Sequence, residues 1–235
     1  MRLVGHDMEE VPPKMSTSCQ YLISLSLTSN RLIDIDPVAQ LTRLTQLVLL
    51  RNKIPKLPST FGNLMNLEIL EMASNRLESL PPTFGNLTKL QKLNLECNRL
   101  KRIPETMSRM CCKTLNLNSN KLIALPHCIA NMPNLLQLSA NDNSLKYLPS
   151  DIGDSKSLVA IHVCNNRLME LPDGIGKLAT LENLWLDFNN ITALPMSFHK
   201  LQSLKEVSER SEASEPCHRR MRRSVRNFIH GYIHY

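Results

Sequence analysis

Apolar and polar positions repeat along most of the chain in a frame built around one recurring asparagine. The asparagines are Asn30, Asn52, Asn75, Asn98, Asn120, Asn143, Asn166 and Asn189. Each has apolar residues eight, five and three positions before it and two positions after it. One copy of the frame consists of Leu90, Leu93, Leu95, Asn98 and Leu100. The steps between asparagines are 22 or 23 residues, and such a period indicates a stack of similar coils.

Each asparagine is preceded by a short stretch in which apolar and polar positions alternate with period two. This alternation predicts a short strand. The constant spacing predicts one strand per coil, with all strands stacked in parallel. We expect each Asn amide to bond backbone groups of the adjoining coil, because stacking would otherwise bury those groups unpaired.

The residues after each asparagine predict an extended return path. Leu or Ile stands five residues after the Asn and is usually followed by Pro, as in Leu57-Pro58 and Leu80-Pro81. Proline holds the residue before it in extended geometry. A further inward apolar residue follows in each coil: Phe61, Phe84, Met107, Ile129, Ile152, Ile175 and Phe198. Together these positions predict one continuous apolar core along the stack.

The combined motif, LxxLxLxxNxL followed by LPxxF/IGxL, resembles the 23-residue typical leucine-rich repeat of intracellular proteins. It is most similar to the repeats of the Ras-pathway scaffolds, Erbin and Scribble, and of fungal adenylate cyclases. The resemblance implies an α/β repeat solenoid, a horseshoe with parallel β-strands on the concave face and extended or 3-10 segments on the convex face. The matching positions build the scaffold, so they do not identify a partner.

The pattern divides the chain into four stretches. Residues 1–18 are predicted to form an incomplete N-terminal repeat in which His6 takes the Asn place. Residues 19–207 form eight complete repeats and the start of a ninth, 208–216 a polar linker, and 217–235 a basic amphipathic tail. Repeat arrays need polar-faced caps. Either the C-terminal residues fold back as a cap, or the chain is a shortened or alternatively joined form of a longer array.

Composition favours a cytoplasmic protein. The seven cysteines are an odd number without a CxxC pair, which indicates reduced thiols. Neither end carries a signal-peptide pattern, and no apolar run approaches the ~18 residues of a membrane-spanning helix. We therefore expect a soluble intracellular chain.

The formal net charge of +7 divides into +4 over residues 1–207 and +3 over residues 208–235, so its density is highest in the tail. Apolar residues of the tail, Phe228 among them, fall at helical spacing and predict a basic amphipathic helix. Its basic residues are Arg219, Arg220, Arg222, Arg223 and Arg226. If it folds as a helix, the tail could bind an anionic membrane surface or a calmodulin-like groove, or cover the last coil. Alternatively, the tail stays disordered or serves as a nuclear or nucleic-acid address. The charge alone does not decide between these readings.

The outward side chains of the strands are predicted to form the concave face. At ~4.8 Å per strand, eight coils give a ladder of order 35–40 Å, long enough for a protein partner. Its C-terminal end is the strongest candidate contact, since Trp185, the only tryptophan, points outward beside Asp187 and Phe188, with His162 one coil away. The alternatives are that the tail or a further coil covers Trp185, or that Phe188 stacks between turns.

The middle of the concave face offers hydrogen-bonding groups. The candidate contacts there are Glu71, Asn94, Glu96, Asn116, Asn118, Asn141 and Asp142. A column of basic residues follows the asparagines: Arg31, Lys53, Arg76, Arg99, Lys121 and Arg167. This column is interpreted as a solvated rim, and the lack of interleaved aromatic residues argues against nucleic acid.

No catalytic constellation emerges from the motifs. The stretch from Gly174 to Lys177 lacks the spacing of a phosphate-binding loop, and the histidines lack metal-ligand spacing. Cys112 takes a core leucine place, which predicts a buried thiol that does not act as a nucleophile. We therefore expect that the protein is not an enzyme and that it has no cofactor, metal site or small-molecule substrate.

The leading hypothesis is therefore a non-enzymatic protein-interaction adaptor or scaffold that binds a partner on its concave face. The resemblance implies signalling through a small GTPase, phosphatase or kinase complex. One alternative is a peripheral membrane or calmodulin-type protein that works through the tail. Another is a structural component of a cytoskeletal or ciliary assembly.

Overall fold

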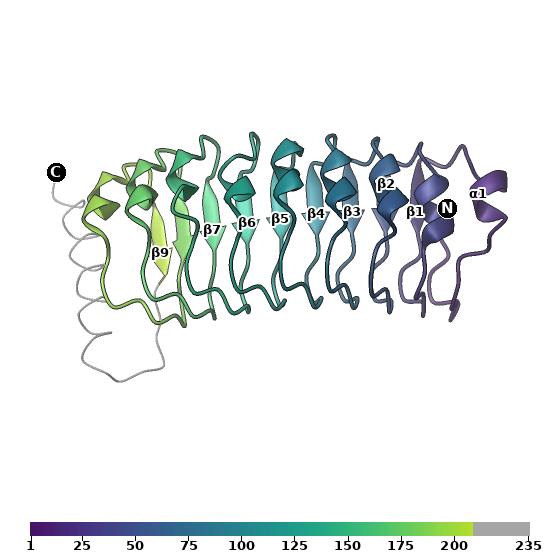
Figure 1. Cartoon of the computed structure of the whole chain (residues 1–235), viewed down its shortest axis with the longest axis horizontal. Helices are drawn as coiled ribbons and strands as arrows, with labels where there is room; N and C mark the ends of the chain where they lie inside the picture. Colours follow the sequence, from purple (N-terminus) through teal and green to yellow (C-terminus); the bar gives the residue numbers. More distant parts are fainter. Residues whose placement is uncertain (209–235) are drawn as a thin grey trace.

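The computed structural model describes residues 1–208 as one elongated, open solenoid whose coils stack along the long axis (Figure 1). Nine parallel strands form a single sheet in sequence order. The strands are β1 Ser24–Ser26, β2 Gln46–Val48, β3 Ile69–Glu71, β4 Lys92–Asn94, β5 Thr114–Asn116, β6 Gln137–Ser139, β7 Ala160–His162, β8 Asn183–Trp185 and β9 Glu206–Ser208. The register aligns the same repeat position in successive coils, as Leu70 opposite Leu93. The predicted parallel stack is confirmed.

Short 3-10 helices line the convex side, opposite the sheet (Figure 1). They are η1 Asp36–Gln40, η2 Ser59–Asn63, η3 Pro82–Asn86, η4 Glu105–Arg109, η5 His127–Ile129, η6 Ile152–Asp154, η7 Asp173–Lys177 and η8 Met196–Lys200. The prolines that precede most of them are extended, for example Pro81 with φ −68° and ψ 151°. One α-helical turn, α1 Met15–Ser18, lies at the N-terminal end and buries Met15. The predicted extended and 3-10 return path is therefore present.

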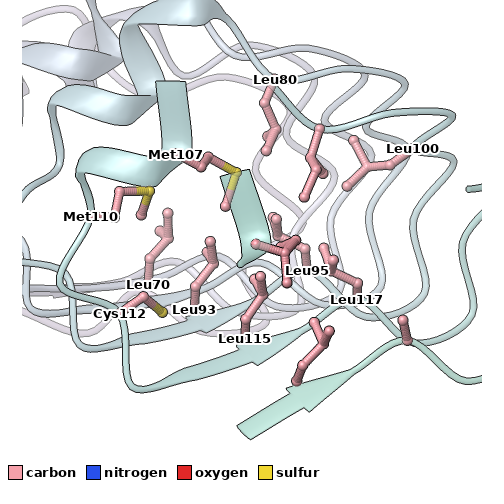
Figure 2. Packing of buried hydrophobic residues seen from close by; sticks show 14 of the residues in the cluster. Leu70, Leu80, Leu93, Leu95, Leu100, Met107, Met110, Cys112, Leu115 and Leu117 are labelled. Carbon is pink, nitrogen blue, oxygen red and sulfur yellow. The ribbon is translucent and has the colours of Figure 1, made fainter. Parts of the chain in front are cut away.

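One apolar core runs through the described coils. The inward residues of the frame are almost fully buried, and the rings of Phe61 and Phe84 stack with centroids 6.0 Å apart. Figure 2 shows Cys112 among these residues, with Met107 and Met110 nearby. Cys112 is buried, as predicted from its leucine place.

The repeat asparagines satisfy backbone groups of two coils at once. Asn52 Nδ2 donates to Leu27 O in the preceding coil at 2.9 Å and to Leu49 O in its own coil at 3.2 Å. Asn52 Oδ1 accepts a bond from Leu32 N at 3.1 Å. The same three bonds recur in the other coils, for example at Asn98. The bonds expected from the sequence pattern are confirmed.

The first coil keeps this pattern although it lacks the asparagine. Asn30 donates to Leu3 O and accepts from His6 N and Met8 N, and Leu3 N donates to Ser26 O. These bonds place His6 at the position that the asparagine holds in later coils. The N-terminal residues thus cover the exposed edge of β1.

The residue before each asparagine adopts a left-handed backbone conformation, which the sequence pattern did not reveal. These residues have φ between 52° and 59°: Ser29, Arg51, Ser74, Cys97, Ser119, Asp142, Asn165 and Phe188. In the first coil Gly5 takes this place with φ 70°. None of them is β-branched, consistent with the steric cost of that conformation for Val, Ile and Thr.

Replacement of Cys112 by leucine tests the packing of one of the two 22-residue coils. Its thiol donates to Thr114 O at 3.1 Å, and a thiol is a weak donor. Leucine stands at the same place in the flanking coils, as Leu90 and Leu135. We expect Cys112→Leu to leave the free energy of unfolding unchanged or to raise it by about 1 kcal/mol. Cys112→Ala is the control and should destabilise by leaving a cavity; clear destabilisation by leucine in urea titrations contradicts this placement.

Candidate partner-binding surface

The outward columns of the sheet lie where the frame predicted, on the concave face. Most of their side chains are partly exposed, and Ser139 is buried. The first column contains Ser26, Val48, Glu71, Asn94, Asn116, Ser139, His162 and Trp185. The register places each of these residues beside its equivalent in the next coil. The candidate contacts at the C-terminal end and in the middle of the face thus belong to one continuous surface.

An aromatic pair dominates the C-terminal end of this surface. His162 and Trp185 are register partners on β7 and β8, and their rings stack with centroids 4.0 Å apart and an angle of 16° between the planes. The Nδ1 atom of His162 lies 3.3 Å from Ser139 Oγ. Burial lowers the pKa of His162, so the ring is neutral at pH 7. The pair is therefore a rigid, largely apolar platform.

At this end of the face, Trp185 and Asp187 each have a buried polar atom without a hydrogen-bond partner among the described residues. Asp187 Oδ2 accepts bonds from the Ser208 hydroxyl and from Cys164 Sγ, the latter at 3.7 Å. Asp187 Oδ1 and Trp185 Nε1 are buried and have no hydrogen-bond partner within residues 1–208. Phe188 is 42% exposed, which excludes a buried spine position between the turns.

The acidic and amide residues of the middle coils bond chiefly to one another. Glu71 forms an ion pair with Lys92 at 2.8 Å and accepts a bond from Asn94 Nδ2 at 2.9 Å. In the next pair of coils, Asn116 Nδ2 donates to Glu96 Oε2 at 3.2 Å. Part of the predicted contact zone therefore stabilises the sheet, and the charge of Glu71 is partly neutralised by Lys92.

Two further asparagines present donors to the open face. Asn118 Oδ1 accepts from Asn141 N at 2.8 Å, and Asn141 Oδ1 accepts from Cys164 N at 2.7 Å. Their Nδ2 groups have no hydrogen-bond partner in the described part of the chain. Asp142, in contrast, lies in the left-handed turn and accepts from Asn165 Nδ2 at 2.6 Å. The structure places Asp142 at the rim, off the strands of the concave face.

A shallow hollow of about 280 Å³ lies on the concave face across β4, β5 and β6. Its lining includes Asn94, Asn116 and Ser139, and it adds Lys92, Thr114 and Gln137. The last three were missed by the sequence reasoning, which considered only the two outward columns nearest the asparagine. They stand two residues before the first column, and the period-two alternation assigns them to the same face.

Potential metal ligands are scattered over the described residues, and the buried thiols are protonated. Within residues 1–208, no group of three or more His, Cys, Asp or Glu side chains is arranged to hold a metal ion. Burial raises the pKa of Cys112 and Cys128 to about 12 and that of Cys164 to about 11, so these thiols are protonated and weakly nucleophilic at pH 7. A Cβ on Gly176 would lie 2.1 Å from Ser197 O, so this glycine serves close packing of coils.

In the described part of the chain, no helix has the length and apolar character needed to cross a bilayer. The predicted tail, with Arg219, Arg220, Arg222, Arg223 and Phe228, lies outside the described residues.

One strand and one 3-10 segment per coil, the asparagine bonds and the open polar sheet define the class: this is a leucine-rich repeat solenoid. The family described as Leucine rich repeat matches residues 42–100. No curated protein matches the chain.

Solved structures of the same fold come from plants and bacteria. The chain is 29% identical to the ectodomain of the plant membrane receptor kinase GASSHO1/SCHENGEN3 from Arabidopsis thaliana, solved in complex with CASPARIAN STRIP INTEGRITY FACTOR 2. The TM-score is 0.75, and the match covers 87% of this chain and 26% of the receptor chain. The plant peptide hormone receptor RGFR1, solved with RGF2, is 23% identical with a TM-score of 0.75 and coverage of 89% and 39%. This chain therefore spans less than half of either receptor chain.

A leucine-rich repeat protein of Leptospira interrogans is 24% identical, with a TM-score of 0.52 and coverage of 89% of this chain and 71% of that one. The matches below 25% identity support the fold alone. The structural matches thus confirm the fold predicted from the sequence pattern, and they do not identify a partner.

Proposed function

We propose that this protein is a non-enzymatic adaptor or scaffold that binds a protein partner on its concave face. The observation that carries the proposal is the His162–Trp185 stack, which holds the only tryptophan half-buried on the open side of the sheet. Rigid aromatic groups of this kind are typical of interface hot spots. The amide donors of Asn141 and Asn118 lie one and two coils before His162 and add directional contacts.

One of the comparisons agrees with a binding role. The GASSHO1/SCHENGEN3 ectodomain, to which the chain is 29% identical, was solved in complex with CASPARIAN STRIP INTEGRITY FACTOR 2. For this chain we infer a partner that lays a polypeptide segment across the strands. The resemblance to Ras-pathway scaffolds favours a small GTPase, phosphatase or kinase complex as that partner.

We infer a cytoplasmic location from the cysteines. The described cysteines are all free, and Cys97 is exposed. Exposed free thiols persist in a reducing compartment. The alternative functions that rely on the basic tail concern residues 217–235, and deletion of that stretch tests them: loss of liposome or calmodulin binding on deletion would favour them.

Substitution of the platform tests the concave-face proposal. We expect Trp185→Ala to reduce recovery of the partner in a pull-down about tenfold or more, as for a hot-spot residue. The separate variant Glu96→Lys reverses a charge in the middle of the face and should also reduce recovery of the partner. Met196→Ala is the matched control, since Met196 is 88% exposed on the convex side. Unchanged recovery with both concave-face variants, each shown to be folded by circular dichroism, would refute the proposal.

A further inference from the structure

The loops that follow the repeat asparagines form one long edge of the solenoid. We call six of them the basic edge: residues 53–56, 76–79, 99–102, 121–124, 144–147 and 167–170. They contain nine Lys or Arg residues and two Glu residues. All nine basic residues are exposed. The edge therefore carries a dense positive charge that the concave face does not share.

The basic residues of the edge are held in register by the backbone. Arg76 N donates to Ile54 O at 3.0 Å, and Lys121 N donates to Leu100 O at 2.9 Å, so each loop is bonded to the loop before it. Successive loops are thus spaced like the strands, at ~4.8 Å. The spacing places like charges close together, which costs free energy unless a counter-charge binds.

The described part of the chain supplies little counter-charge to this edge. None of the nine basic side chains forms an ion pair within residues 1–208. The loop of the preceding coil is different, because Arg31 pairs with Asp7 at 3.1 Å. Elsewhere Lys92, Lys177 and Lys205 are also paired. Within residues 1–208 the nine basic side chains of this row are therefore left without an ion-pair partner.

An apolar patch adjoins the positive row at its C-terminal end. Ile123, Tyr147 and Met169 are 65%, 50% and 54% exposed. Their loops are in contact, since Lys146 N donates to Ile123 O at 3.4 Å and Met169 N to Lys146 O at 3.3 Å. The hydroxyl of Tyr147 also lies 3.7 Å from Met169 Sδ. Exposed apolar side chains on three consecutive coils form a contiguous surface next to the charges.

We propose that the basic edge binds an acidic segment of a protein partner that ends in apolar side chains. Carboxylates of the segment lie over Arg76, Arg99 and Lys121, and the apolar side chains lie on Tyr147 and Met169. The edge spans five coil steps, about 24 Å, which an extended peptide of about seven residues covers. A single-stranded nucleic acid would need several aromatic faces for its bases, and Tyr147 is the one aromatic residue on the edge. The concave face takes no part in this contact.

Anisotropy titration with the full chain tests this binding mode. The probe is a fluorescein-labelled peptide of six Asp and Glu residues followed by Leu and Phe. The five tail arginines, Arg219, Arg220, Arg222, Arg223 and Arg226, are changed to Gln in every variant to remove a competing basic stretch. We expect R76E/R99E/K121E to weaken binding about tenfold or more, because three attractions become repulsions. The matched control K89E/R109E/K113E reverses three charges away from the edge and should change the Kd less than about twofold.

A second variant separates the apolar contribution from the charge. Tyr147→Ser should weaken the peptide that ends in Leu and Phe while leaving an all-Glu peptide unaffected. Equal loss in the edge variant and the control variant would overturn the proposal, as would absence of measurable binding. Tighter binding of a uridine oligonucleotide of equal charge would also overturn it and assign the edge to nucleic acid.

Discussion

Asn98→Ala is expected to lower the free energy of unfolding by roughly 3 kcal/mol, because it leaves buried backbone groups of two coils unpaired. Asn98 Nδ2 donates to Met72 O and Leu95 O, each at 3.0 Å, and Asn98 Oδ1 accepts from Leu77 N at 2.9 Å. Alanine cannot replace any of these bonds. Met72, Leu77 and Leu95 are fully buried, so their backbone groups are shielded from bulk water.

Urea unfolding followed by circular dichroism measures this loss, and Asn66→Ala is the matched control. Asn66 Nδ2 donates to Thr42 O at 3.0 Å and Asn66 Oδ1 accepts from Lys89 Nζ at 2.8 Å, both at exposed places, so its loss should cost less than about 1 kcal/mol. Similar losses of unfolding free energy in the two variants would show that the hydrogen bonds of the repeat asparagines do not hold the coils together. A smaller denaturant slope for Asn98→Ala would indicate that the stack separates into two unfolding units.

Gly153→Ala is expected to destabilise the fold by about 3 kcal/mol or more, through a clash that the backbone cannot relieve. A Cβ at Gly153 would lie 1.8 Å from Gly174 O and 2.5 Å from Gly174 C. Both are backbone atoms of the next coil, so the convex sides of the two coils would have to separate. Separation would expose core around Ile152 and Ile175.

A comparison with Gly5 distinguishes this clash from the general effect of losing a glycine. Gly5 has φ 70°, and a Cβ there would meet no atom within 4 Å. Gly5→Ala should therefore cost only the ~1 kcal/mol of a left-handed alanine. Thermal denaturation of both variants checks the order. A loss for Gly153→Ala that is no larger than that for Gly5→Ala would contradict the close approach of the coils.

The parts of the fold that follow from the sequence are those in which one side-chain type recurs at one position. The leucines of the frame and the asparagines have the same surroundings in every coil. The sequence period therefore predicts the strands, the core and the hydrogen bonds of the asparagines. The left-handed turn residue could not be predicted in this way. Ser74, Cys97 and Phe188 share no chemistry, and their common property is a backbone angle that the repeat imposes.

The candidate surface was only partly predictable for a related reason. Outward positions vary from coil to coil, so their roles depend on neighbours one coil away. The stacking of His162 on Trp185 could be anticipated from their equal repeat positions. The ion pair of Glu71 with Lys92 and its hydrogen bond from Asn94 could not be anticipated, because they depend on side-chain conformations that the repeat spacing does not encode. A search of all three outward positions of each strand would have included the lining of the hollow.

Photo-crosslinking in cells tests the central claim, binding on the concave face, most directly. A benzophenone amino acid is placed at Trp185, and at Met196 on the convex side as the control position. We predict a discrete crosslinked protein from position 185 and none of that species from position 196. The same crosslinked protein from position 196, with none from 185, would contradict a concave binding face.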